Sequence, residues 1–63
     1  MNNLSRIRLR EGFTLKELSE KSAVDTAKLN RVERGLVDMP GMAWKAVAEV
    51  LGVTVDELLA DNN

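Results

Sequence analysis

The chain contains neither cysteine nor histidine, and these absences exclude several ways of stabilising or activating a small protein. Without cysteine there is no disulfide and no thiolate ligand, and without histidine the imidazole ligand of zinc sites is missing. Tyrosine is absent as well, which leaves few candidate bases or nucleophiles. The adjacent acids Asp56 and Glu57 stand at an expected helix start, where they counter the helix dipole. We therefore expect no metal site, no cofactor and no enzymatic activity.

Long apolar runs are also missing. No segment approaches the ~20 apolar residues of a membrane span, and the basic start MNNLSRIRLR lacks the apolar run of a secretory signal. We expect a soluble, cytoplasmic protein. Its 63 residues suffice for a single domain, residues 1–63. A domain of this size hides about 60% of its unfolded surface and is marginally stable, so we expect packed helices and a contribution from self-association.

The charges nearly cancel, with nine basic and ten acidic residues and a net charge of −1, but they are unevenly distributed. Residues 1–34 carry eight basic and five acidic residues, a net charge of +3, whereas residues 35–63 carry one lysine and five acids, a net charge of −4. Such polarity allows one basic face to approach phosphate while the rest keeps the domain soluble. An uneven scatter of surface charge by chance is the alternative interpretation.

Helix signals recur along the whole chain, and strand signals are nearly absent. Side chains that accept from backbone amides mark helix starts, and glycine, which tolerates a left-handed backbone, marks helix ends. We expect the first three helices to begin at Leu4, Thr14 and Asp25 and to end at Gly12, at Lys21 or Ser22, and at Gly35. Glu17, three residues after Thr14, completes a capping box.

The second half of the chain predicts two more helices. A helix ending near Leu51 has an apolar stripe spaced i, i+3, i+4, i+7, formed by Trp44, Val47, Ala48 and Leu51. Trp44 is expected in the core, with its indole nitrogen bonded to a backbone carbonyl or a water. A second capping box, Thr54 with Glu57, opens a short helix expected to bury Val55, Leu58 and Leu59. The predicted fold class is therefore all-α, with five helices.

Residues 14–35 are the informative segment. They predict a capped helix, a tight turn through Ala23 and Val24, a second capped helix and a glycine stop. That succession is the arrangement of a helix-turn-helix, in which the second helix projects its N-terminal half outward.

The ordered residues of this segment resemble the lambda-repressor-like, or Xre, family of phage and bacterial regulators, and the resemblance extends from about Leu4 to Leu59. The matching positions are Phe13, Thr14, Leu18-Ser19, Ala23-Val24-Asp25, Val32-Glu33-Arg34-Gly35 and the run LGVTVDELL. Four positions depart from the family pattern. Ala23 stands for glycine, Ser19 for alanine and Asp25 for serine or threonine, and Leu15 stands where a polar DNA contact is common.

The resemblance implies a compact five-helix domain that binds double-stranded DNA as a homodimer, acting as a repressor or controller of transcription. The recognition helix, about residues 26–34, would enter the major groove. Its implied base-reading residues are Thr26, Ala27, Lys28 and Arg31. The implied phosphate contacts are Thr14, Lys16 and Arg34, with Asn30 able to reach either a phosphate or a base edge. Arg8 and Glu33 match a structural salt bridge of the family.

The loop after the recognition helix carries an unusual number of apolar residues. Leu36, Val37 and Met39 stand where the family often has basic or amide side chains. Exposed apolar clusters mark interfaces, so we expect these residues at the dimer interface. The alternative is that they fold back over a small core. A second function also stays open at this point, a protein-interaction module such as an antitoxin subunit with weak or no DNA binding.

Overall fold

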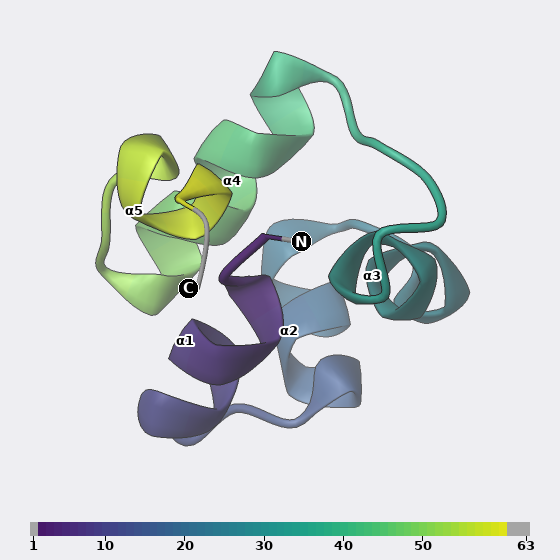
Figure 1. The fold of residues 1–63 in the computed structure, drawn as a ribbon. Helices are drawn as coiled ribbons and strands as arrows, with labels where there is room; N and C mark the ends of the chain where they lie inside the picture. Colours follow the sequence, from purple (N-terminus) through teal and green to yellow (C-terminus); the bar gives the residue numbers. More distant parts are fainter. Residues whose placement is uncertain (1, 61–63) are drawn as a thin grey trace.

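The computed structural model describes residues 2–60, which form five helices and no strand (Figure 1). The helices are α1 (Leu4–Arg10), α2 (Leu15–Ser22), α3 (Thr26–Glu33), α4 (Gly41–Leu51) and α5 (Val55–Leu59). The predicted all-α, five-helix fold is confirmed. Among residues 2–60, no helix combines the length and the apolar character needed to cross a membrane.

The predicted helix caps are present. The Thr14 hydroxyl accepts from the amide of Glu17, and the Glu17 carboxylate accepts from the amide of Thr14, both at 3.0 Å. Thr54 and Glu57 repeat this box at the start of α5. Asp25 caps α3 by accepting from the amide of Lys28 at 3.2 Å. Each cap of this kind stabilises its helix by about 1 kcal/mol.

The core is a single cluster of apolar side chains contributed by all five helices and one loop. Its members are Leu4, Ile7, Leu18, Leu29, Val32, Met39, Trp44, Val47, Ala48, Leu51 and Leu58. The predicted stripe of α4 is therefore buried as expected. The prediction for α5 is wrong at Leu59, which is 50% exposed. A five-residue helix presents one side to the core, and Leu58 occupies that side, so its neighbour is turned away.

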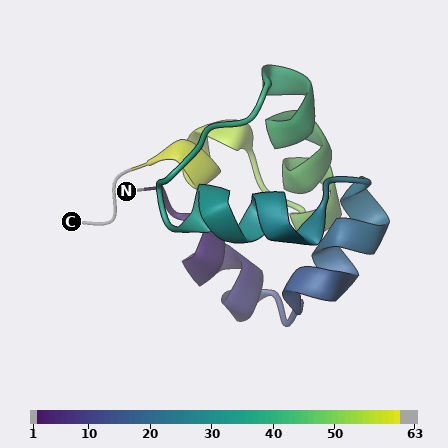
Figure 2. The ribbon, with the colours of Figure 1, turned by 90° about the vertical axis from the view of Figure 1, so that its right-hand side faces the viewer.

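The helices are arranged so that α3 lies at the edge of the fold. α2 packs against both α3 and α4, and α5 packs against α4 and α1. The amide of Asn3 donates to the carbonyl of Leu58 at 2.8 Å, which joins the start of α1 to α5. Figure 2 shows α3 running across the front of the molecule with no other helix over it.

The loop between α3 and α4 differs in part from the prediction. Leu36 and Val37 are 61% and 40% exposed, but Met39 is 5% exposed and belongs to the core. The Asp38 carboxylate explains this, because its Oδ1 accepts from the amide of Met39 at 2.8 Å and from the indole nitrogen of Trp44 at 3.1 Å. These bonds hold the loop against α4. The expectation of an exposed Met39 in an apolar surface cluster is therefore wrong.

Candidate nucleic-acid interface

The turn between α2 and α3 is short and left-handed. Ala23 has φ 63° and ψ 21°, and among residues 2–60 it is the one non-glycine residue with a positive φ. A β-carbon in this conformation costs about 1–2 kcal/mol. Two serines of α2 form hydrogen bonds with Val24, the residue after Ala23. Ser19 Oγ donates to the Val24 carbonyl at 2.5 Å, and Ser22 Oγ accepts from the Val24 amide at 3.3 Å. The chain can then enter α3 directly at the Asp25 cap.

The side chains of α3 divide cleanly between the core and the surface. Leu29, Val32 and Glu33 are buried. Thr26, Ala27, Asn30 and Arg31 are exposed, and Lys28 is half-buried. Because helical residues three or four apart share a side, Ala27, Asn30 and Arg31 lie along one exposed stripe, with Thr26 and Lys28 at its N-terminal end. The predicted base-reading residues thus lie together on the exposed side of α3. The N-terminal half of this helix follows directly after the turn.

The predicted phosphate contacts are divided between two helices. Thr14 and Lys16 are exposed at the start of α2, the end farthest along that helix from the turn, and Arg34 is exposed at the end of α3. The capping box occupies two backbone amides at the start of α2. Hydrogen bonds from the backbone and side chain of Thr14 hold the pKa of Glu17 below its usual value. The positive charge of Lys21 also lowers this pKa, so the Glu17 side chain is a charged carboxylate at neutral pH. Leu15, between Thr14 and Lys16, packs against the core.

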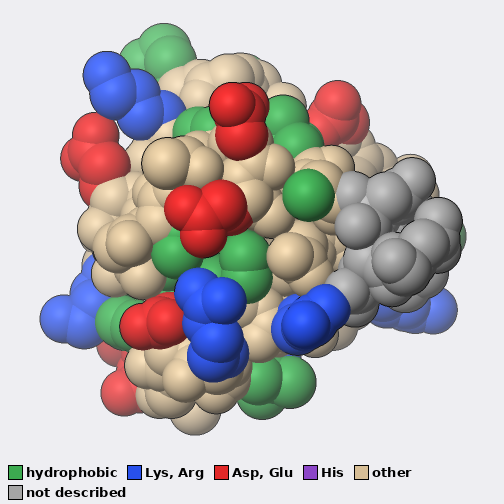
Figure 3. All heavy atoms as spheres, turned by 60° about the vertical axis from the view of Figure 1, so that its left-hand side comes forward, with side chains coloured by type: hydrophobic (Ala, Val, Ile, Leu, Met, Phe, Trp, Pro, Cys, Tyr) green, Lys and Arg blue, Asp and Glu red, His purple; other side chains and the backbone are tan. Residues whose placement is uncertain are grey.

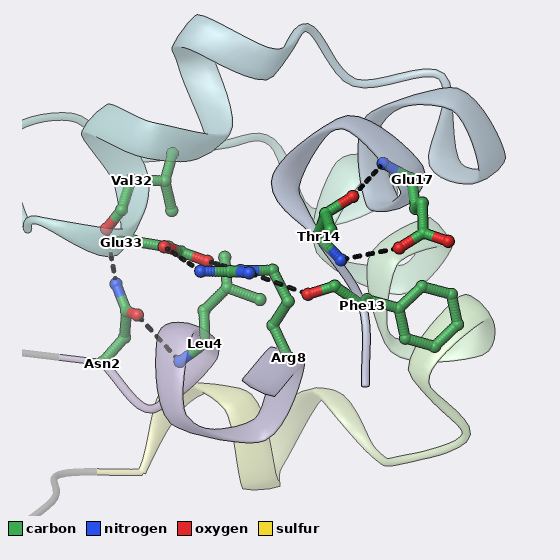
Figure 4. Close-up of polar contacts among 8 residues, drawn as sticks. All are labelled: Asn2, Leu4, Arg8, Phe13, Thr14, Glu17, Val32 and Glu33. Atoms are coloured by element: carbon green, nitrogen blue, oxygen red, sulfur yellow. Dashed lines mark hydrogen bonds and ion pairs between the residues drawn. The ribbon is translucent and has the colours of Figure 1, made fainter. Parts of the chain in front are cut away.

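Arg8 and Glu33 form an ion pair that holds the C-terminal end of α3 in the fold. Arg8 Nε lies 2.6 Å from Glu33 Oε2, and the two side chains are 11% and 7% exposed. A second contact joins Arg8 Nη2 to Glu33 Oε1 at 3.4 Å, and Nη1 donates to the carbonyl of Phe13 at 2.8 Å. Figure 4 shows the guanidinium lying between α3 and the segment that leads into α2. Arg8 is thus occupied inside the fold.

Asn2 makes a second connection to the end of α3 that the sequence reasoning missed. Its Nδ2 donates to the carbonyl of Val32 at 2.8 Å, while its Oδ1 accepts from the amide of Leu4 at 3.0 Å (Figure 4). The second bond lies just before α1, whose N-cap residue is Asn3 and makes no side-chain cap bond. The first joins residues 30 positions apart and has no sequence signal.

The face of the molecule over α5 and α1 carries charges of both signs. Figure 3 shows acidic and basic side chains interspersed on it, with small apolar areas between them, so charge of one sign does not gather there. Within residues 2–60, no pocket is found and no group of three or more acidic side chains is placed to hold a metal ion. The exposed stripe of α3 is therefore the best-defined candidate site.

Comparison with known proteins identifies relatives of this fold. A family model described as a helix-turn-helix domain matches residues 3–60. The solution structure of the N-terminal DNA-binding domain of SinR, the master biofilm regulator of Bacillus subtilis, is 33% identical in sequence, with a TM-score of 0.77. The match covers 95% of this chain and 88% of that one. The curated protein sequences contain no match. The chain belongs to the helix-turn-helix family, with the five-helix fold of lambda-repressor-like DNA-binding domains.

Proposed function

We propose that the chain is a sequence-specific, double-stranded-DNA-binding regulator of transcription that acts in the cytoplasm as a repressor or controller protein. The observation that carries this proposal is the division of α3, which is buried through Leu29 and Val32 and open to solvent along Ala27, Asn30 and Arg31. A helix of these dimensions, about 10–12 Å across with its side chains, fits the major groove, which is about 12 Å wide. The 33% identity to a DNA-binding domain supports the same role.

The exposed residues of α3 have the chemistry needed to read base edges. Arg31 and Lys28 donate, and guanine offers the O6 and N7 acceptors. Thr26 both donates and accepts, and the methyl group of Ala27 suits the methyl group of thymine. Asn30 carries an amide, which bonds adenine or a phosphate. In this proposal the N-terminal half of α3 enters the groove.

Phosphate contacts would come from Thr14, Lys16 and Arg34, which flank the reading stripe along the chain. Of these three residues only Lys16 and Arg34 are cations. Each neutralised phosphate contributes about −0.9 to the slope of log affinity against log salt. We therefore expect a shallow salt dependence, a slope of about −4 or less in magnitude per protomer if Lys28 and Arg31 also reach phosphate.

We further propose that the protein acts as a homodimer. Leu36 and Val37 leave an exposed apolar pair in the loop after α3, and a second copy covering it would place two recognition helices about one DNA turn, ~34 Å, apart. Leu36→Glu would then shift the dimer towards monomer. Light scattering at high micromolar concentration tests this, and a mass of one chain for the unaltered protein would contradict it.

The DNA-binding proposal is tested by selecting duplexes from a random pool and then comparing variants on the selected site. We expect Lys28→Ala and Arg31→Ala each to lose roughly 1–3 kcal/mol of binding and to relax the preference at particular base pairs. Lys45→Ala, which removes an exposed lysine of α4, is the matched control and should leave the preference unchanged. An equal loss on every duplex would make Lys28 and Arg31 phosphate contacts.

The second candidate function is a protein-interaction module, such as an antitoxin subunit, with weak or no DNA binding. It is favoured by the exposed pair Leu36 and Val37 and by the acidic second half of the chain. The two functions separate at low salt, where a DNA-binding protein binds even non-specific duplex. Absence of binding at low salt would select the second function.

A further inference from the structure

Two departures from the helix-turn-helix pattern, Ser19 and Ala23, meet at the turn. Ala23 holds a left-handed backbone that residues with a β-carbon rarely adopt. Ser19 lies one helical turn earlier on α2, and its carbonyl accepts from the amide of Ala23 at 2.9 Å. Its hydroxyl donates to the carbonyl of Val24, the residue directly after Ala23, at 2.5 Å. Ser19 therefore bonds the chain on both sides of the strained residue.

Ser22 contributes less to holding this turn. Its hydroxyl donates to the carbonyl of Leu18 at 2.6 Å within α2 and accepts from the amide of Val24 at the longer distance of 3.3 Å. The Val24 carbonyl, by contrast, has Ser19 as a close partner. Val24 itself packs partly against the core, and α3 begins two residues later. The bond from Ser19 thus acts at the last point where α2 can control the direction of α3.

We propose that Ser19 is a positioning residue for the recognition surface: its bond to Val24 keeps Ala23 left-handed and so fixes the direction in which α3 leaves α2. The proposal rests on the proposed function, because the fixed direction matters where residues of both helices must meet one duplex. Without the hydroxyl, Ala23 favours a negative φ and the turn samples other geometries. Apparent affinity falls in proportion to the fraction of molecules that keep the competent geometry.

The test is a double-mutant cycle of Ser19→Ala and Ala23→Gly, measured on the selected duplex at temperatures where unfolding curves show every variant to be folded. We expect Ser19→Ala to weaken binding about fivefold or more, which corresponds to a competent fraction of one fifth or less. The slope against salt should not change, since Ser19 would touch no phosphate. Ser5→Ala, a serine removed from α1, is the matched control and should bind as the unaltered chain does.

Glycine adopts a left-handed backbone without strain, so the turn in the Ala23→Gly background should no longer depend on the serine. There we expect Ser19→Ala to change binding affinity by less than about twofold, because the fraction of molecules with the binding-competent turn should hardly change. If Ser19→Ala alone does not fold, its effect on binding can still be measured in the Ala23→Gly background. An unchanged affinity for Ser19→Ala, an equal loss in both backgrounds, or an altered salt slope would each overturn the proposal.

A DNA-independent measurement separates this proposal from the proposed function. Residual dipolar couplings report the orientation of α3 relative to α2 in the free protein. We expect Ser19→Ala to change that orientation or to scatter it, and Ala23→Gly to restore it. If the unaltered chain binds no duplex while the couplings behave in this way, the DNA-binding function fails and the positioning role of Ser19 stands. Unchanged couplings in Ser19→Ala would refute the positioning role.

Discussion

The ion pair between Arg8 and Glu33 gives a quantitative test of how α3 is held in the fold. Both side chains are nearly excluded from water, at 11% and 7% exposure, and Arg8 also bonds the carbonyl of Phe13. Removing one member of a buried pair leaves the other charge without a partner, which costs about 3–5 kcal/mol. A 63-residue domain has a total stability of roughly 3–9 kcal/mol on the usual scale of 0.05–0.15 kcal/mol per residue.

We therefore expect Arg8→Met or Glu33→Leu alone to remove about half or more of the free energy of unfolding. With a urea dependence of about 1 kcal/mol per molar, typical of small domains, the unfolding midpoint would fall by roughly 3–5 M, or the variant would be unfolded without urea. The double variant removes both charges and should recover most of the loss, because an apolar pair of similar volume often replaces a buried ion pair without net cost. Urea unfolding followed by circular dichroism measures all four stabilities.

The exposed pair of Arg10 and Glu11 supplies the control. Its nitrogen–oxygen distance is 3.0 Å, but the side chains are 56% and 38% exposed. A surface pair contributes about 0–1 kcal/mol, so Arg10→Met should shift the midpoint little. The reasoning would be refuted if Arg8→Met cost no more than Arg10→Met, or if the double variant of Arg8 and Glu33 were less stable than both single variants.

Three further predictions concern the loop, the core and α5. The amide of Met39 and the indole N–H of Trp44 hold the pKa of Asp38 below its ordinary value of 3.8. The stability that this contact contributes is therefore fully present above pH 3.8, and it is lost as the pH falls through the lowered pKa. Trp44 fluorescence should report that acid transition, and Asp38→Asn should lack it. Met39→Ala should cost about 2–5 kcal/mol of unfolding free energy, whereas Leu36→Ala should stay within about 0.5 kcal/mol in dilute protein; similar losses would place Met39 outside the core. Thr54→Ala should cost about 1 kcal/mol in urea unfolding, and a neutral result would mean that its cap contributes nothing.

The helix boundaries could be predicted from the sequence because their causes are local. A cap such as Thr14 or Asp25 bonds an amide three residues away, so both partners are visible in one short segment. The exposed stripe of α3 follows in the same way from helical periodicity. The pairing of Arg8 with Glu33 was expected instead from the family resemblance, because the two residues are 25 positions apart in the sequence.

What could not be predicted depends on contacts between elements. Met39 is buried because Asp38 reaches the indole of Trp44, and nothing in the residues of the loop specifies that path. Leu59 is exposed because Leu58 occupies the side of α5 that faces the core, and which of the two leucines does so depends on how α5 packs. The bond from Asn2 to the carbonyl of Val32 depends on where α1 lies beside α3. These are properties of the assembled fold, which a pattern of residue types does not contain.

The claim that the exposed side of α3 receives the duplex is tested most directly by NMR. ¹⁵N-labelled protein is titrated with the selected duplex, and the amide shifts are mapped onto the fold. We expect the largest changes at Thr26, Ala27, Lys28 and Arg31, with smaller ones at the start of α2. Largest changes on α4 and α5, or no change at low salt, would contradict the claim.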